Sequence, residues 1–279
     1  MQSKITGGET DHIFSGNVLS KYDVKYYQCK ETGFIQTETP YWLNEAYQSA
    51  IVALDVGLAL RNEQLANVTE RILIRYFKDG NRFLDYGGGY GQYVRMMRDR
   101  GFNFFLFDEY AENLYARFFG IKNKEDLQKE KFEVVTAFEV FEHLVDPVAS
   151  LEELLQYSDT ILFSTELVPD QKFTSPNDWW YFVPEIGQHV SFYTLKSLQY
   201  LATKMQCNLY SNGTNLHIIT RKKFEKDPFV YLRSFKGFDQ WSNSVKKLHD
   251  KIWGTKPKPS LMHSDSELIK SIIKKGGQP

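Results

Sequence analysis

The sequence predicts an α/β protein built on a doubly wound, Rossmann-like, mostly parallel sheet, with a helical N-terminal cap and a helical C-terminal extension. Two observations carry this prediction. Short apolar runs alternate with helix-compatible segments over residues 70–222, a pattern that favours parallel strands joined by crossover helices. The first apolar run also ends in a glycine-rich turn, Gly87 to Gly91, and a helical segment follows it from Gln92 to Arg100.

Three parts are expected along the chain. Residues 1–69 form an N-terminal arm and helical cap, because apolar residues recur at three- and four-residue steps from Tyr41 onward. Residues 70–222 form the Rossmann-like domain. Residues 223–279 form a basic helical extension, in which a Pro-rich linker beginning at Gly254 separates two helical patterns.

Composition indicates an ordinary folded protein. The chain has 279 residues, of which 42% are hydrophobic, so it is long enough to bury a full core. Residues 1–11 are polar and do not resemble a signal peptide, and the apolar stretch 50–60 is too short to span a bilayer. The only two cysteines imply no disulfide framework. A cytoplasmic protein is therefore expected.

Charge is unevenly distributed although the formal net charge is −1. Residues 221–279 hold 14 Lys and Arg against 6 Asp and Glu, and the rest of the chain holds 20 against 29. A solvated, Lys-rich helical surface is the simpler interpretation. The alternative is a docking surface for an acidic partner or a membrane face. The aromatic and basic pattern of nucleic-acid binding modules is absent, so a nucleic-acid partner is not favoured.

The glycine turn narrows the class of ligand. Gly87, Gly89 and Gly91 give the spacing Gly-x-Gly-x-Gly, whereas a dinucleotide fingerprint requires Gly-x-Gly-x-x-Gly. This departure disfavours NAD and points to a ligand without a pyrophosphate. A second apolar run ends in Asp108, and the ends of neighbouring parallel strands lie side by side. Asp108 is therefore expected to face the same crevice, where a carboxylate can accept hydrogen bonds from ribose hydroxyls.

Further motifs follow in order. A third apolar run precedes Phe138-Glu139-Val-Phe-Glu-His143, and aromatic motifs follow at 180–184 and 188–193. Together with the glycine turn and Asp108, these motifs resemble class I S-adenosylmethionine-dependent methyltransferases over residues 70–222. The branch with the closest resemblance is common in bacterial glycan and natural-product gene clusters.

This resemblance implies S-adenosylmethionine as cofactor and methyl transfer, at oxygen, to a sugar, glycan or related small molecule. Aromatic faces suit the positive sulfonium of the cofactor. The residues that the resemblance places at the cofactor are Asp85, Tyr86, Gly87, Gly88, Gly89, Tyr90, Gly91, Asp108, Phe138 and Glu139.

Three residues compete for the role of the base that would remove a hydroxyl proton. His189 lies in a Trp- and Pro-containing loop on the expected acceptor side, but it could instead order that loop through backbone hydrogen bonds. Glu142 and His143 follow a strand end, but such residues often cap the next helix, which Asp146-Pro147 opens. The aromatic residues 179–181 could stack on the acceptor or wedge the loop against the core.

No metal site is predicted. Cys29 lies in a segment similar to a reduced zinc knuckle, but Thr32 stands where a second cysteine would be, and a closed zinc site needs four ligands. Two other classes remain open. One is an NAD(P)-dependent or nucleotide-sugar-modifying Rossmann enzyme, and the other is a non-catalytic, methyltransferase-like subunit.

Overall fold

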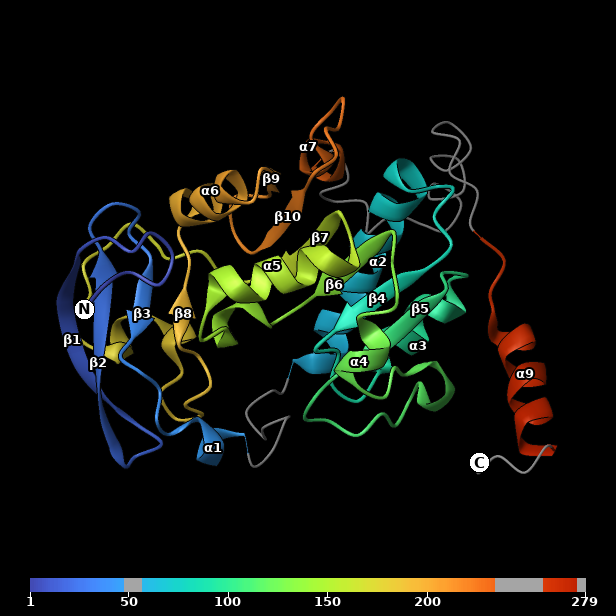
Figure 1. Cartoon of the computed structure of the whole chain (residues 1–279), viewed down its shortest axis with the longest axis horizontal. Helices are drawn as coiled ribbons and strands as arrows, with labels where there is room; N and C mark the ends of the chain where they lie inside the picture. Colours follow the sequence, from blue (N-terminus) through green and yellow to red (C-terminus); the bar gives the residue numbers. More distant parts are fainter. Residues whose placement is uncertain (48–56, 234–257, 275–279) are drawn as a thin grey trace. The chain divides into compact units, whose positions relative to one another are not determined.

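The computed structural model describes residues 1–47, 57–233 and 258–274 (Figure 1). Six strands form a mixed sheet in the order β5-β4-β6-β7-β10-β9, and four strands form a second sheet in the order β1-β2-β3-β8. The mixed sheet and its helices confirm the predicted α/β class. Two compact units make up the chain: Met1–Leu54 with Val134–Lys223, called here the first unit, and Asp55–Glu133 with Phe224–Pro279, the second unit.

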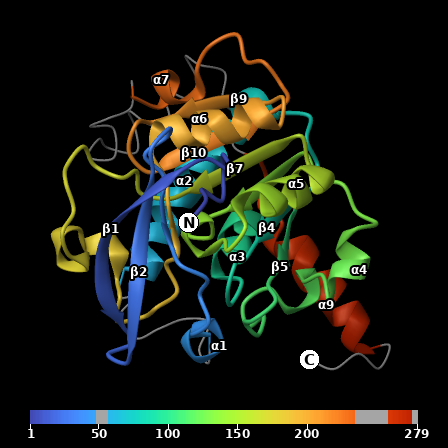
Figure 2. The same cartoon turned by 60° about the vertical axis from the view of Figure 1, so that its left-hand side comes forward.

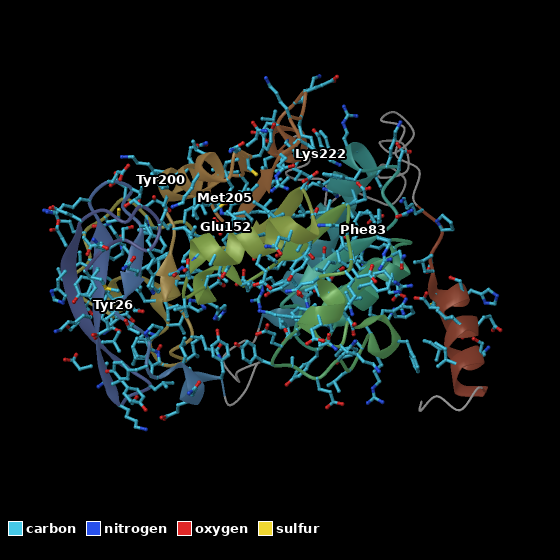
Figure 3. The ribbon with its side chains drawn as sticks, viewed as in Figure 1. Tyr26, Phe83, Glu152, Tyr200, Met205 and Lys222 are labelled. Atoms are coloured by element: carbon cyan, nitrogen blue, oxygen red, sulfur yellow. The ribbon has the colours of Figure 1, made fainter. Side chains whose placement is uncertain are left out.

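The second unit contains the glycine-rich turn. Strand β4 (Phe83–Tyr86) pairs in parallel with β5 (Phe104–Phe107). Phe83, labelled in Figure 3, stacks its ring on that of Phe104 with centroids 5.1 Å apart. Helix α3 (Gln92–Asp99) follows the turn as predicted and buries Tyr93, Val94 and Met97. The remaining elements are α2 (Leu58–Tyr76), η1 (Arg117–Phe119), α4 (Lys124–Leu127), α7 (Pro228–Arg233) and α9 (Met262–Lys274).

The first unit contains the other four strands of the mixed sheet. Strand β6 (Val134–Ala137) runs parallel to β7 (Thr160–Ser164), as the sequence predicts. Strands β10 (Leu216–Thr220) and β9 (Asn208–Ser211) add an antiparallel edge. The remaining elements of this part are η2 (Phe141–His143), α5 (Pro147–Tyr157), η3 (Pro176–Asp178), η4 (Trp180–Phe182) and α6 (Leu195–Lys204).

The N-terminal arm forms strands that the sequence analysis did not predict. Strands β1 (Thr10–Val18) and β2 (Tyr22–Cys29) make an antiparallel hairpin, and β3 (Ile35–Thr37) and β8 (Ser191–Phe192) complete the second sheet (Figures 1 and 2). Of the helical pattern expected from Tyr41 onward, the structure describes the short α1 (Leu43–Ala46) and the start of α2 at Leu58. The positions between them, 48–56, lie outside the described residues.

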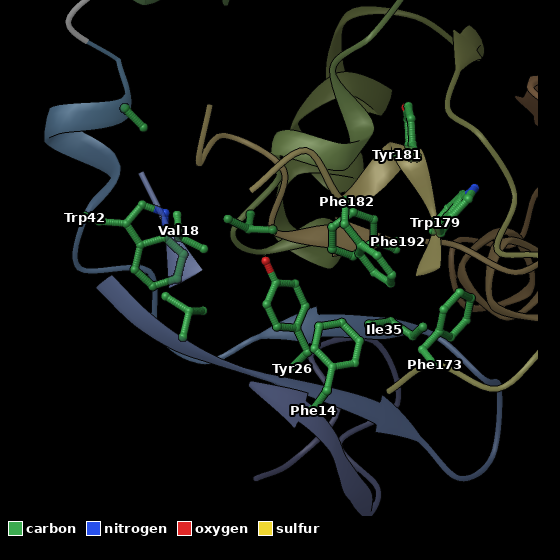
Figure 4. Packing of buried hydrophobic residues seen from close by; sticks show 13 residues of the cluster. Phe14, Val18, Tyr26, Ile35, Trp42, Phe173, Trp179, Tyr181, Phe182 and Phe192 are labelled. Carbon is green, nitrogen blue, oxygen red and sulfur yellow. The ribbon is translucent and has the colours of Figure 1, made fainter. Parts of the chain in front are cut away.

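An aromatic core fills the space beneath this second sheet (Figure 4). Its members come from the hairpin, from the segment around α1 and from the loop between β7 and β8. Phe14 stacks on Tyr26 with ring centroids 4.5 Å apart, and Phe182 packs edge-on against both. Trp42 is buried and donates its indole N–H to the Gly187 carbonyl at 2.7 Å. The N-terminal strands therefore support the loop that carries His189.

The described residues of the C-terminal extension include two helices, α7 and α9. Helix α9 is fixed to α3 by a buried, bidentate ion pair, in which the Arg98 guanidinium donates to both Asp265 oxygens at 2.8 Å. Most of the predicted Pro-rich linker, up to residue 257, lies outside the described residues. Among the helices described, none combines the length and apolar character needed to cross a membrane. The domain bounds 1–69, 70–222 and 223–279 stay a prediction.

Candidate active site

The glycine turn leaves β4 and enters α3 through backbone conformations that favour glycine. Gly87, Gly89 and Gly91 have positive φ angles of 70°, 57° and 82°. A Cβ atom added to Gly88 would collide with the carboxylate of Asp85 and with Leu106. The turn therefore lies directly on buried side chains, and its half-buried residues 87–90 present backbone to a ligand. This cradle, free of side chains at four positions, fits a bound nucleoside.

Asp85 supports the turn from below. It is buried, with only 2% of the residue exposed. Two tyrosines of the motif are half-buried. The ring of Tyr86 lies 5.5 Å from that of Phe107, and the Tyr90 carbonyl accepts hydrogen bonds from the amides of Leu114 and Tyr115 at 3.0 Å. Contacts at Tyr86, where the turn begins, and at Tyr90, near its end, therefore fix the turn in place.

Asp108 lies at the end of β5 beside the turn, as predicted. One carboxylate oxygen accepts the amide N–H of Gly89 at 2.8 Å. The other accepts the amides of Tyr110 at 2.8 Å and Ala111 at 2.7 Å. Asp108 therefore orders the turn and its own loop.

The first unit holds the second group of predicted residues. Glu139 follows β6 with a positive φ of 54°, which is costly for a residue with a side chain and is typical of functional sites. Its amide donates to the Ser164 hydroxyl at 2.8 Å, and that hydroxyl donates back to the Glu139 carboxylate at 2.5 Å. Phe138 precedes it and is half-buried. Ser164, at the end of β7, was not predicted as a site residue.

Glu142, His143 and His189 come together in the first unit. Their potential ligand atoms all lie within 4.8 Å of one another. The two imidazole rings are perpendicular, with centroids 5.0 Å apart. The Val190 amide donates to the Glu142 carbonyl at 2.8 Å, and the Ser191 hydroxyl donates to the Leu144 carbonyl at 2.6 Å, so the two segments are fixed against each other.

Both histidines are oriented by backbone carbonyls. His143 Nδ1 lies 3.2 Å from the Gln188 carbonyl, and His189 Nδ1 lies 2.7 Å from the Tyr181 carbonyl. Because a carbonyl oxygen only accepts, each Nδ1 carries the proton and each Nε2 keeps its lone pair. The predicted backbone hydrogen bond of His189 is therefore present, and it leaves the other nitrogen available for chemistry.

Burial sets the protonation of this cluster. It lowers the pKa of His143 to about 3, with a further contribution from His189, and it lowers the pKa of His189 to about 4. Both imidazoles are thus neutral at pH 7. Burial also raises the pKa of the Glu142 carboxyl well above its usual value, and the charge of Glu139 adds to this effect.

Glu142 does not cap the helix that follows. Asp146 is the N-cap of α5 and accepts the Ala149 amide at 3.0 Å, so the capping alternative for Glu142 is wrong. Among the loop aromatics, Trp179 and Tyr181 are buried in the core, which favours their wedging role. Trp180 is 71% exposed and is the one of the three that is accessible to an acceptor.

A parallel strand, a glycine turn, a helix and a carboxylate at the end of the next strand define an α/β protein that binds a nucleoside-type ligand. The family model described as a methyltransferase domain matches residues 59–212, more than half of the chain, and the chain therefore belongs to this family. Membership confirms the resemblance to class I S-adenosylmethionine-dependent methyltransferases. The protein is a methyltransferase, and S-adenosylmethionine is its methyl donor.

Solved structures show remote likeness. An O-methyltransferase family protein from Burkholderia thailandensis is 14% identical, with a TM-score of 0.49 over 66% of this chain and 68% of that one. TnmH is 16% identical, with a TM-score of 0.49 over 66% and 62%. The plantazolicin methyltransferase BpumL in complex with SAH is 13% identical, with a TM-score of 0.45 over 63% and 94%. No curated protein matches the chain.

Proposed function

We propose that this protein is an O-methyltransferase whose acceptor is a hydroxyl of a sugar, a glycan or a related small molecule. S-adenosylmethionine supplies a methyl group on a sulfonium, which is an activated leaving group. The observation that best supports this proposal is the cluster of Glu142, His143 and His189. In this cluster, two neutral imidazoles keep unprotonated Nε2 atoms. An unprotonated imidazole nitrogen can accept the proton of an attacking hydroxyl, and the lowered pKa values make both imidazoles weak bases that need close positioning of that hydroxyl.

The cofactor contacts are assigned by chemistry. The backbone of residues 87–91 would lie against the nucleoside, and Asp108 would accept a hydrogen bond from the ribose. Asp85 would act by supporting the turn, since its carboxylate lies beneath Gly88. Tyr86, Tyr90, Phe138 and Glu139 complete the proposed cofactor residues, and support for these four is their half-buried position at strand ends or in the turn.

His189 is the first candidate for the base. Its Nδ1 hydrogen bond at 2.7 Å is shorter than the 3.2 Å bond of His143, so its ring is held more firmly. His143 and Glu142 would assist from adjacent positions, since the His143 Nε2 lies 3.9 Å from the Glu142 carboxylate. Holding the hydroxyl in line with the donor can contribute about 7–11 kcal/mol to lowering the barrier.

The deciding experiment measures ligand binding and product together. S-adenosylmethionine at about 100 times its Kd should stabilise the folded protein by about 2.7 kcal/mol, whereas NAD should leave the melting temperature unchanged. Incubation with sugar and phenol acceptors should add the mass of one methyl group. Stabilisation by NAD instead would favour the NAD(P)-dependent or nucleotide-sugar-modifying alternative. Cofactor binding without product across a broad acceptor panel would favour a non-catalytic subunit.

Location and partners complete the proposal. Cys29 and Cys207 are both free thiols, as is usual in a reducing compartment, which supports a cytoplasmic location.

The excess of basic residues over 221–279 supports contact with an acidic partner or a membrane face. Vesicle flotation with anionic and neutral lipids at two salt concentrations would test the membrane contact, which should weaken as salt rises.

A further inference from the structure

The cluster of Glu142, His143 and His189 has the composition of a metal site. It offers one carboxylate and two imidazole nitrogens, with all ligand atoms within 4.8 Å of one another. Three protein ligands of these types hold catalytic zinc in several enzymes, and the fourth position stays open for water or substrate. The sequence analysis predicted no metal, because it considered only the cysteine segment of the arm.

Both imidazoles are arranged as metal ligands usually are. A ligating histidine commonly donates its second ring N–H to a carbonyl or carboxylate, which fixes the tautomer and aims the other nitrogen at the metal. Here the carbonyls of Gln188 and Tyr181 accept the two Nδ1–H groups, at 3.2 Å and 2.7 Å. The Nε2 lone pairs of His143 and His189 are thereby set before any ion binds.

The burial of Glu142 is a second, independent observation that points to a metal site. Its side chain has 0% exposure, and neither carboxylate oxygen has a hydrogen-bond partner among the residues that the structure describes. Interactions with the hydroxyls of Tyr181 and Thr165 favour the ionised form of Glu142, but burial outweighs them and keeps its pKa raised. A buried carboxyl without a partner is costly and calls for an explanation such as an ion. The carboxylate of Glu142 faces Nε2 of His143 at 3.9 Å.

We propose that Glu142, His143 and His189 bind a divalent transition-metal ion, with Zn²⁺ the best fit. Imidazole with one carboxylate suits zinc, and neither sulfur nor a redox change is involved. In a tetrahedral site with bonds of about 2.1 Å, ligand atoms are about 3.4 Å apart. The present separations of up to 4.8 Å therefore need to close by about 1.4 Å at most.

The His143 side chain is 21% exposed, so the cluster is not completely closed to solvent. The open coordination position would receive the acceptor hydroxyl and lower its pKa, as zinc does for bound water. The hydroxyl proton would pass to solvent, the new O–CH₃ bond would form, and the S–CH₃ electron pair would remain on sulfur. With its Nε2 bound to the metal, His189 would not act as the base, so this use of the metal replaces that role. It still rests on the proposed methyl transfer to a hydroxyl, whereas the binding of the metal does not.

The test measures metal binding in the full-length protein without cofactor or acceptor. After treatment with a chelator, the wild-type protein should bind one Zn²⁺ per chain by equilibrium dialysis with metal analysis. Glu142→Gln and His189→Gln should each raise the Kd for Zn²⁺ by about 100-fold or more, since changes to groups behind the ligands alone cost about 10–100-fold. His12→Gln, at an exposed histidine of the same unit, should leave the Kd unchanged.

The same variants also serve as controls for correct folding. Glu142→Gln should keep or raise the melting temperature of the metal-free protein, because it replaces an unpartnered buried carboxyl. Absence of stoichiometric Zn²⁺ binding by the wild type, or wild-type affinity in either cluster variant, would overturn the metal site. If the protein methylates an acceptor but binds no Zn²⁺, only the metal site is overturned. If it binds Zn²⁺ but not S-adenosylmethionine, the proposed function is overturned instead.

Discussion

The carboxylate of Asp108 accepts the amide N–H of Gly89 at 2.8 Å, so the residue that follows β5 also holds the turn that follows β4. Its second oxygen accepts the amides of Tyr110 and Ala111. A carboxylate has about four acceptor positions, and three are used here. Asp108 therefore both shapes the cradle and retains capacity for about one hydrogen bond from a ribose.

The first prediction concerns this double role. Asp108→Ala should weaken S-adenosylmethionine binding by about 1.5–3 kcal/mol, because charge-assisted hydrogen bonds are lost. It should also speed hydrogen exchange at the Gly89 amide, which loses its acceptor. Calorimetry and exchange on the same variant measure the two effects. An unchanged affinity in a folded Asp108→Ala protein would remove Asp108 from the cofactor site.

The second prediction concerns the turn itself. Gly87→Val and Gly89→Val should each abolish cofactor binding while the protein stays folded, since a β-branched side chain is strained at positive φ and would occupy the ligand's place. Gly213→Val is a matched control, because Gly213 has a φ of 83° and open space around it. The control carries similar strain and should bind the cofactor normally. Binding by both turn variants would show that the ligand lies elsewhere.

Local signals in the sequence predicted the second unit well. The turn, helix α3 and the strand that ends at Asp108 all follow from glycine spacing and short apolar runs, which are properties of neighbouring residues. The start of α5 was equally readable, because Asp146-Pro147 is both an N-cap and a first-turn proline.

Long-range contacts could not be read in the same way. His189 lies beside His143 because the Val190 amide and the Ser191 hydroxyl donate to the Glu142 and Leu144 carbonyls of the segment after β6. The burial of Glu142 without a partner depends on that same packing. The N-terminal hairpin was missed because its aromatic residues are buried by packing on a distant loop, as Phe14 is by Phe182.

The third prediction concerns the chemistry at His189. His189→Ala should lower turnover by about 10²–10⁴-fold and leave cofactor affinity nearly unchanged. Loss of the hydrogen bond to the Tyr181 carbonyl should cost only about 0.5–1.5 kcal/mol of stability. Turnover and melting temperature measured on this variant separate the two roles. An active but less stable protein would make His189 purely structural.

The pH dependence of turnover adds a second check. Because burial holds the pKa of His189 near 4, the imidazole takes up a proton only as the pH approaches 4. The acid limb of the rate profile should therefore lie well below the usual histidine value of about 6.5. A limb near 6.5 would show that a different or more exposed histidine controls the rate.

The fourth prediction concerns the attachment of α9. The Arg98 and Asp265 side chains are each 5% exposed, and removing one partner of a buried ion pair typically costs about 3–5 kcal/mol. Asp265→Ala should therefore release α9 from α3, visible as fast hydrogen exchange over residues 262–274. Glu267→Ala is the control on the same helix, because its pair with Lys270 is exposed and worth less than about 1 kcal/mol.

Acid should release the same helix in the unmodified protein. Burial alone would raise the pKa of Asp265, but the hydrogen bonds and charges of Arg98 and Arg95 outweigh it and hold that pKa below the ordinary value. A carboxyl with a lowered folded-state pKa contributes its full stability above the unfolded pKa of about 3.9 and loses it as the pH falls through the folded value. Exchange protection of α9 should thus persist at pH 5 and begin to decline only below about pH 4, as the pH falls toward the lowered pKa of Asp265. Loss of protection already at pH 6 would mean that the Arg98–Asp265 pair does not hold the helix.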